Sequence, residues 1–409
     1  MLVILKEQEF TQNNIMAPKH IELINIIKRS SYRFHPFIFR FYPFKEGLLS
    51  KYREELLWGF ISENKNIKWT PQLISQYEDL FDWEDRIWLN PSLPISIDFI
   101  ETNNYNVNYY DLALNKGKHW DSQFIYHFKN KWNWHYILLN DSIDWTQKLF
   151  VDLDLFKKRI SIINGKTLWT EAFILNNINK FDWFFLSQNP YLPWTDELLE
   201  KLKPVWSPSF WNGITINTGI PWSVEFIERY VETDLKTDLA LKWSGLSLNE
   251  SIPWSPDLIE RFMGKWDWDV LSGNNGVAFT IDQIEKYKDK IIWKRKHPNF
   301  GSLSDNTSLE WSEELIDTFI ENWCWDDLSK NIGVQWTEKM IIKYWDKLNL
   351  NELFRNPSLP WSFDFLIKFE NEIFKAWSMD SHTENCRQII WNNIFEDNLD
   401  DQMIDVLLS

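Results

Sequence analysis

The chain has 409 residues, of which 44% are hydrophobic, and a formal net charge of −16 at pH 7. This charge argues against broad binding to nucleic acids or anionic membranes, because phosphate contacts require clustered lysine and arginine. Two cysteines exclude a disulfide framework and are typical of a reducing compartment. The apolar run at the start is too short for a signal peptide and no later run could span a membrane, so we expect a cytoplasmic protein.

Residues 31–44 interleave aromatic and basic side chains and allow two interpretations. Such a stretch could stack nucleic-acid bases with support from cation–π contacts. Alternatively, Phe44 stands 25 residues before Trp69, at the spacing of the repeat that follows. Terminal repeats are usually atypical because they cover an open end of the core, so the spacing favours a degenerate capping repeat.

Three columns of residues define a repeat with a period of about 25 residues. The first column holds large apolar anchors: Trp69, Ile95, Trp120, Trp145, Trp169, Trp194, Trp222, Trp254, Phe279, Trp311, Trp336 and Trp361. Asparagine stands five residues before every anchor: Asn64, Asn90, Asn115, Asn140, Asn164, Asn189, Asn217, Asn249, Asn274, Asn306, Asn331 and Asn356. A helix-capping residue follows each anchor: Thr70, Ser96, Asp121, Thr146, Thr170, Thr195, Ser223, Ser255, Thr280, Ser312, Thr337 and Ser362.

Each repeat predicts two short helices. After the cap, apolar residues fall three, four and seven places on, as in Leu198, Leu199 and Leu202 after Thr195, which predicts a helix of about nine residues. The anchor before the cap fits a hydrophobic staple. A second helix of about two turns, with an aromatic residue eleven places before the anchor, is expected to end at the asparagine.

Two roles are predicted for the asparagine column. Asparagine tolerates the left-handed conformation at a helix C-terminus. Twelve such side chains at one position per repeat are also expected to bond backbone groups of the adjacent repeat, as an internal ladder.

The predicted fold is therefore all-α, an α-solenoid of about twelve repeats with degenerate terminal caps. A β-rich alternative is weak because the apolar spacing is three and four, not two. We expect four segments: an N-terminal helical segment at 1–30, a capping repeat at 31–57, the repeat array at 58–375 and a C-terminal cap at 376–409.

Two seven-residue enlargements interrupt the period, at 231–241 and 287–297. Repeat proteins often carry function where they depart from the repeat. The second enlargement gathers basic residues with a tryptophan, and we predict a partner-binding patch here: Lys286, Lys288, Lys290, Trp293, Lys294, Arg295 and Lys296. The alternative is a helix extended by two turns with solvated charges. Charge reversal at Lys294, Arg295 and Lys296 is expected to leave folding intact.

No catalytic, cofactor or metal site is predicted. His119, His127 and His135 are evenly spaced but do not share one helical face. Glycine-rich phosphate loops and hydrolase motifs are absent from the sequence. Tryptophans outside the columns are the better candidates for exposure: Trp88, Trp206, Trp293, Trp345 and Trp377.

These features favour a non-enzymatic, acidic scaffold that binds a protein partner on its concave face or on its enlarged edge. Nucleic acid and membrane partners are not expected. Two alternatives stay open: a structural protein that assembles with itself, and an inhibitor or immunity-type protein that sequesters an effector.

Overall fold

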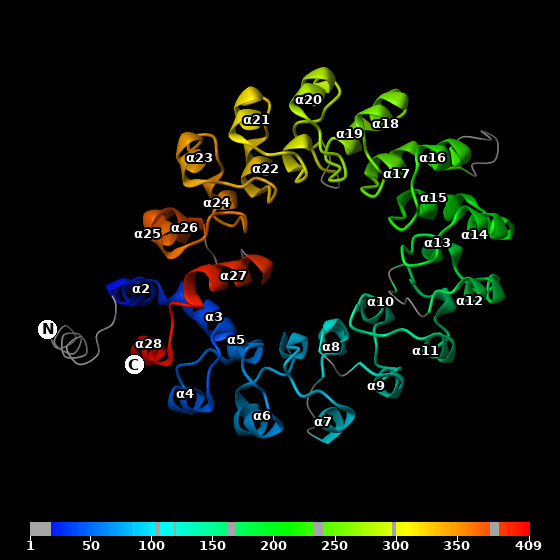
Figure 1. Ribbon diagram of the computed structural model, residues 1–409. Helices are drawn as coiled ribbons and strands as arrows, with labels where there is room; N and C mark the ends of the chain where they lie inside the picture. The colour runs from blue at the N-terminus through cyan, green and yellow to red at the C-terminus, as the bar shows by residue number, and fades with distance from the viewer. Residues whose placement is uncertain are drawn as a thin grey trace. The chain divides into compact units, whose positions relative to one another are not determined.

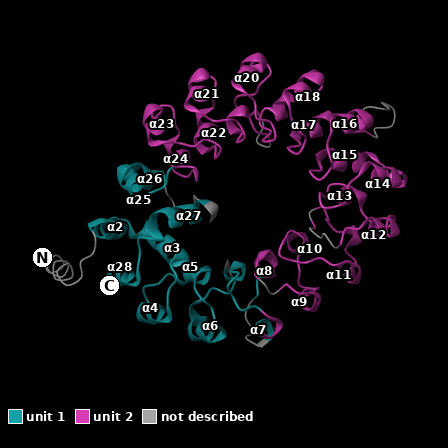
Figure 2. Ribbon diagram, in the orientation of Figure 1, with its two compact units in different colours: residues 1–95, 99–108, 360–409 teal, residues 96–98, 109–359 magenta. Residues whose placement is uncertain are grey.

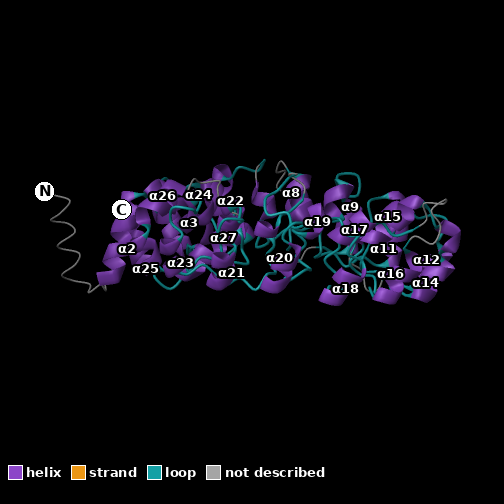
Figure 3. Ribbon diagram, turned by 90° about the horizontal axis from the view of Figure 1, so that it is seen from above, coloured by secondary structure: helices purple, strands orange, loops and turns teal. Residues whose placement is uncertain are grey.

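The computed structural model describes residues 18–84, 86–102, 107–117, 120–161, 163, 168–231, 240–296, 300–376 and 384–409. Its described residues form short helices and no named strand, which confirms the all-α prediction (Figure 3). The chain divides into two compact units, one of residues 1–95, 99–108 and 360–409 and one of residues 96–98 and 109–359 (Figure 2).

In unit 2 the helices alternate between two rows of a curved array (Figure 1). The inner row, on the concave side, consists of α8 (Tyr109–Leu114), α10 (Trp134–Ile137), α13 (Trp183–Leu186), α15 (Pro208–Ile216), α17 (Trp243–Leu248), α19 (Trp268–Leu271), α22 (Trp325–Lys330) and α24 (Leu350–Leu353). The outer row consists of α9 (Ser122–His127), α11 (Gln147–Asp152), α12 (Glu171–Asn176), α14 (Asp196–Lys201), α16 (Val224–Tyr230), α18 (Pro256–Arg261), α20 (Ile281–Tyr287), α21 (Glu313–Thr318) and α23 (Glu338–Lys343). Three 3-10 turns join them: η3 (Leu155–Lys157), η4 (Lys203–Val205) and η5 (Leu303–Asp305).

The helices are shorter than the sequence predicts. Helix α14 covers six residues, Asp196–Lys201, instead of about nine. Leu202 follows it as a completely buried C-cap, and Pro204 disfavours a further α-helical turn at Lys203, where the 3-10 turn η4 begins. Inner helices such as α13 and α19 span four residues, which is one turn.

The capping column is confirmed at eleven positions. In each, the side chain accepts a hydrogen bond from the backbone N–H three residues on, as Thr195 does from Leu198 at 3.1 Å. The eleven residues are Thr70, Asp121, Thr146, Thr170, Thr195, Ser223, Ser255, Thr280, Ser312, Thr337 and Ser362. For Ser96, which precedes α7, the cap stays a prediction.

The predicted asparagine ladder is present in the described repeats. The amide of Asn217 donates to the backbone oxygens of Ser187 at 2.8 Å and Asn189 at 3.0 Å, both in the preceding repeat. Its Oδ1 accepts from the backbone N–H of Gly219 at 2.7 Å. Amide bonds to the preceding repeat recur at Asn64, Asn90, Asn140, Asn189, Asn249, Asn274, Asn306, Asn331 and Asn356. Asn164 lies outside the described residues.

The predicted left-handed backbone at the asparagines is wrong. Asn217 has φ −74° and ψ 124°, Asn331 has φ −67° and ψ 116°, and both are extended. Among the described residues only Asp154 combines a side chain with positive φ. An extended asparagine directs its Oδ1 to the N–H two residues on, an Asx turn, and leaves its amide for the neighbouring repeat.

A further column of small hydroxyl residues was not predicted. It stands two residues before the asparagine and is buried: Ser62, Ser187, Thr215, Ser247, Ser272, Ser304 and Ser329. The Ser247 hydroxyl donates to the Trp243 oxygen at 2.7 Å and accepts from the Asp267 N–H of the next repeat at 2.9 Å. Most of these hydroxyls therefore satisfy one backbone group in their own helix, while Ser304 bonds the Trp293 oxygen, and the later copies accept from an N–H of the adjacent repeat. The signal in the sequence is the recurring Ser-x-Asn.

Unit 1 brings together the two ends of the described chain. Its helices are α2 (Pro18–Arg29), α3 (Ser31–Phe41), α4 (Glu46–Lys51), α5 (Trp58–Ser62), α6 (Pro71–Tyr77), most of α7 (Ile97–Thr102), α25 (Phe363–Lys368), α26 (Glu370–Ala376), α27 (Glu384–Ile390) and α28 (Asp401–Leu408). It also holds η1 (Glu78–Leu80), η2 (Arg86–Leu89) and a π-helical turn, η6 (Trp391–Phe395). Helix α28 packs on α2 (Figure 1). The segments predicted as two separate caps therefore share one core.

Apart from the exposed Tyr32, the phenylalanine and tyrosine side chains of 31–44 belong to this core and are not free to stack on bases. Phe34 lies 5.7 Å from the ring of Phe395, and Phe41 stacks on Trp391 at 5.8 Å, measured between ring centroids. All four rings are buried. In place of a repeat with an asparagine and a cap, the segment forms the long helix α3.

Candidate partner-binding surfaces

The second enlargement is a loop, so the alternative of an extended helix is wrong. Helix α20 ends at Tyr287, and residues 291–296 are not helical. Trp293 lies 5.3 Å from Phe319 and 5.0 Å from Trp323, measured between ring centroids, and is partly buried.

Trp293 takes the place of the aromatic residue that stands eleven places before the anchor in other repeats. In another repeat Trp243 makes the equivalent contacts with Phe262 and Trp266. The inserted residues therefore follow Trp293, and its indole is packed between repeats.

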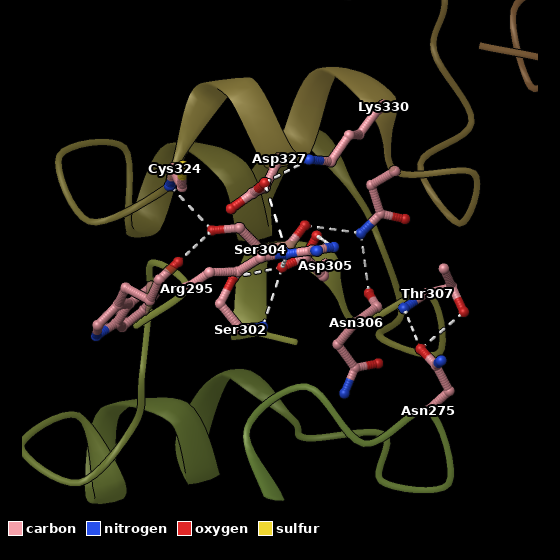
Figure 4. A network of polar contacts seen from close by, with 12 residues as sticks. Asn275, Arg295, Ser302, Ser304, Asp305, Asn306, Thr307, Cys324, Asp327 and Lys330 are labelled. Atoms are coloured by element: carbon pink, nitrogen blue, oxygen red, sulfur yellow. Dashed lines mark hydrogen bonds and ion pairs between the residues drawn. The ribbon is translucent and has the colours of Figure 1, made fainter. Parts of the chain in front are cut away.

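Arg295 joins the enlargement to η5 of the same repeat and approaches α22 of the next one (Figure 4). Its Nε donates to Asp305 at 2.7 Å, its Nη2 bonds the other oxygen of the same carboxylate, and Asp327 lies 3.8 Å away. Asp305 also accepts from the backbone N–H and hydroxyl of Ser302, at 3.0 and 2.9 Å. Lys330 bonds Asp327 at 2.7 Å, so both carboxylates are paired.

Burial makes this network costly to break. The Asp305 and Asp327 side chains are only 10% and 9% exposed. Burial alone would raise the pKa of Asp305, but the hydrogen bonds from Arg295 and Ser302 outweigh it and lower the pKa. Charge reversal of Arg295 would therefore bury unpaired carboxylates, and the expectation that folding is unaffected has to be revised.

Most cations of the predicted patch pair within the chain. Lys286 pairs with Glu260, Lys288 with Glu285, and Lys296 with Asp269. Within the described part of the chain, Lys290 and Lys294 make no ion pair, and both are exposed. The structure therefore leaves two lysines, in place of a patch of six cations, for an acidic partner.

The first enlargement begins and ends at neighbouring residues. Val231 and Leu241 form an isolated bridge, and the Leu241 N–H donates to the Tyr230 oxygen at 3.0 Å. Residues 232–239 lie outside the described residues. Because the insertion leaves and rejoins the repeat at neighbouring residues, the packing on its two sides is continuous.

Exposed apolar side chains recur along the inner row of unit 2. They come from α8, from the residues that follow α10, and from α13, α15 and α17 (Figure 1). The side chains are Tyr110, Leu139, Phe184, Ile216 and Leu248, each 44–46% exposed. We call them the inner apolar row. The Tyr110 ring also lies 4.1 Å from that of Tyr136, measured between centroids, which links α8 to α10.

The tryptophans outside the columns do not form such a surface. Trp88 is completely buried, and Trp206, Trp293 and Trp345 are partly buried. Trp377 lies outside the described residues. Burial follows from their ring contacts, such as the 4.9 Å between the centroids of Trp206 and Trp211.

A groove of about 670 Å³ lies between the first turns of α20 and α21. Apolar side chains line it, namely Phe279, Ile281, Trp311 and Leu315. The carboxylates of Asp282, Glu310 and Glu314 line it too. A smaller groove of about 390 Å³ between α9 and α11 contains Lys148 as well as Asp152.

The described residues offer little for metal or thiol chemistry. No group of three His, Cys, Asp or Glu within the described ranges is placed to hold a metal ion. His119 lies outside them. Burial raises the pKa of the Cys386 thiol to about 12, and burial also raises that of Cys324, so both thiols are protonated at neutral pH.

Comparison of the chain with family models, curated proteins and solved structures finds no match. In the part of the chain that the structure describes, no helix combines the length and the apolar character needed to cross a membrane.

Proposed function

We propose that this protein is a non-enzymatic scaffold, an acidic α-solenoid that binds a protein partner on the concave side of unit 2. The inner apolar row carries this proposal, because five inner-row segments of unit 2 each expose a large apolar side chain. Contiguous exposed apolar surface on a soluble domain is typical of protein-binding sites. Repeat arrays commonly bind their partners on such concave surfaces.

The location on the inner row is the distinguishing feature. Large exposed apolar residues also occur on outer helices, at Tyr126, Val151 and Ile342, but these come from α9, α11 and α23, of which only the first two are neighbours. Scattered single residues of this kind need no functional explanation. The inner residues recur along one row of helices, which is the arrangement that an elongated ligand would contact.

End-to-end self-assembly is the weaker alternative. That alternative requires exposed aromatic faces at the terminal helices. In unit 1, α2 and α28 pack on each other, and Lys45 and Lys51 pair with Asp401 and Asp405. Among the described residues, the rings of Phe34, Phe41, Trp391 and Phe395 are buried in this core and are not available for such an end face.

The test compares two matched triple variants. One is Leu139→Lys, Ile216→Lys and Leu248→Lys on the inner row, and the other is Tyr126→Lys, Val151→Lys and Ile342→Lys on the outer row. All six residues are 44–55% exposed, and both variants change the net charge equally. Tagged wild-type protein and both variants would be used for capture from host cells, followed by titration of the purified partner.

We expect the inner variant to lose the partner that the wild type and the outer variant retain. A loss of roughly tenfold or more in affinity corresponds to about 1.4 kcal/mol. Equal retention by both variants would remove the inner apolar row from consideration. Melting curves check that both variants fold.

A further inference from the structure

The groove between α20 and α21 carries three carboxylates that lack a cationic partner in the described part of the chain. Several other acids of the outer row pair with a cation of a neighbouring repeat: Lys201 with Glu171, Arg229 with Asp196, Arg261 with Glu228, Lys286 with Glu260, and Lys343 with Glu313 and Asp317. Asp282, Glu310 and Glu314 are exposed and pair with no cation among the described residues.

The connectors add polar side chains to the groove. The residue before the anchor is proline in five of the twelve repeats and varies in the others. In two adjacent repeats it is Glu310 and Gln335, and both line the groove.

An aromatic ring is accessible in the groove. Trp311 is one of two anchor tryptophans that are only partly buried, whereas Trp336 in the next repeat is 2% exposed. Its indole N–H bonds the Asn306 oxygen at 3.0 Å, which fixes the ring. A fixed tryptophan face beside carboxylates attracts a cation through both its quadrupole and their charge.

The chemistry of the groove favours an organic cation over a metal ion. Within the described ranges, these carboxylates are not grouped closely enough to hold a metal. Their negative charge is spread around an apolar floor that includes Ile281 and Trp311. A lysine or arginine side chain matches this arrangement, because its aliphatic part packs on apolar surface while its charged end meets carboxylates. The volume of about 670 Å³ lies within the roughly 300–1,000 Å³ typical of ligand pockets.

We propose that this groove binds a lysine- or arginine-rich segment of a protein partner, with one basic side chain seated against Trp311 between Asp282, Glu310 and Glu314. The proposal rests on the protein-binding function proposed above and adds the chemistry of a second contact. The net charge of −16 favours the approach of such a segment.

A defined peptide tests the proposal without knowledge of the partner. The probe is a short fluorescein-labelled lysine-rich peptide, and its control is the same peptide with every lysine acetylated, which removes the charge. Binding is measured by fluorescence anisotropy at about 0.15 M salt, where long-range attraction is screened beyond about 8 Å. We expect the acetylated peptide to bind at least about tenfold more weakly.

Matched variants separate the groove from bulk charge. The groove variant is Asp282→Asn, Glu310→Gln and Glu314→Gln. The control variant is Glu197→Gln, Asp257→Asn and Asp364→Asn, which alters three exposed acids in first turns of other helices and changes the net charge equally.

We expect the groove variant to lose about tenfold or more in peptide affinity and the control variant to stay within about twofold of the wild type. The single substitution Glu310→Gln, in the connector, should weaken binding about threefold. It keeps the proposal testable if the triple variant does not fold. Equal losses in both triple variants, or absence of peptide binding by the wild type, would overturn the proposal. The lysine variant of the inner apolar row should still bind the peptide, so failure of one proposal is distinguishable from failure of the other.

Discussion

The side-chain amide of Asn217 donates a hydrogen bond to the backbone oxygen of Asn189, at 3.0 Å. The same oxygen accepts the indole N–H of Trp194 at 2.8 Å. One carbonyl therefore joins the asparagine of the next repeat to the anchor of its own repeat. Both asparagines are completely buried, so no water replaces these bonds when one is removed.

The variant Asn217→Ala should lower the free energy of unfolding by about 3 kcal/mol, because an unsatisfied buried polar group costs roughly 1–3 kcal/mol. It removes the amide bond to the Ser187 oxygen and leaves the Gly219 N–H without its acceptor. Urea denaturation at pH 7 measures the loss. Asn212→Ala, an exposed position on α15, is the control and should change stability by less than about 0.5 kcal/mol. Equal stability of the two variants would show that the ladder is dispensable.

The variant Asn217→Asp should be less stable than Asn217→Ala at pH 7. It keeps the acceptor for Gly219 but directs a carboxylate oxygen at the Ser187 and Asn189 oxygens. Burial and these oxygens raise the pKa of the new carboxyl in the folded chain. Its protonated form, which can donate, is therefore favoured by folding, so the deficit should shrink as pH falls toward the unfolded-state pKa. Denaturation at a series of pH values measures this trend, and a deficit independent of pH would contradict it.

The variant Ser247→Ala should destabilise the protein by about 1–2 kcal/mol, since it leaves the Trp243 oxygen and the Asp267 N–H without the hydroxyl that bonds both. Ser244→Ala, an exposed serine on the same helix, should be nearly neutral. Thermal melting of the two variants is the measurement. If Ser247→Ala is as stable as the wild type, the buried hydroxyl residues contribute through packing and not through these hydrogen bonds.

The variant Arg295→Leu should cost about 3–5 kcal/mol, because it leaves Asp305 buried without its partner. Lys296→Ala removes an exposed pair with Asp269 and should cost less than about 1 kcal/mol. Adding Asp305→Asn to Arg295→Leu should restore part of the loss. If the double variant is no more stable than Arg295→Leu, the buried carboxylate is not the cause.

Acid should weaken the contacts between the terminal segments in unit 1. Hydrogen bonds from Lys45 and Tyr42 lower the pKa of Asp401, and those from Lys51 and Tyr52 lower the pKa of Asp405. Because each pKa is lower in the folded chain, this stabilisation is present above the ordinary carboxyl range and is lost as pH falls through the folded-state pKa. In the variant Asp401→Asn with Asp405→Asn, unfolding measured from pH 7 downward should lose less stability with acid than in the wild type. Parallel pH profiles would contradict this.

The local elements of this fold could be predicted because they depend on residues close in sequence. Thr195 caps a helix through an N–H three residues away, and the ladder follows from one asparagine per period. The backbone conformation at Asn217 was not predicted correctly. The two hydrogen bonds to the preceding repeat form with an extended asparagine, and they outweigh its tolerance of the left-handed conformation.

The position of the second insertion and the terminal packing depend on contacts distant in sequence. Counting eleven residues back from Trp311 reaches Phe300, another aromatic residue, so spacing alone cannot show that Trp293 takes the column position. Likewise, nothing near Phe34 in the sequence indicates Phe395 as its neighbour. The candidate surfaces were missed for the same reason: the exposure of Leu139 or Trp311 is decided by the neighbouring repeats.

The backward direction of the ladder bears on how such a chain can change in length. Asn249 bonds the oxygens of Thr215 and Asn217, and Asn217 bonds those of Ser187 and Asn189, so these two repeats use the same pair of positions. Asn331 and Asn356 use that pair as well, whereas Asn189 and Asn306 each bond a different pair of oxygens. Between repeats that share the pair, duplication or deletion of one complete period presents the following asparagine with equivalent oxygens, so their number can vary by whole-unit gene duplication while these buried amides keep their partners.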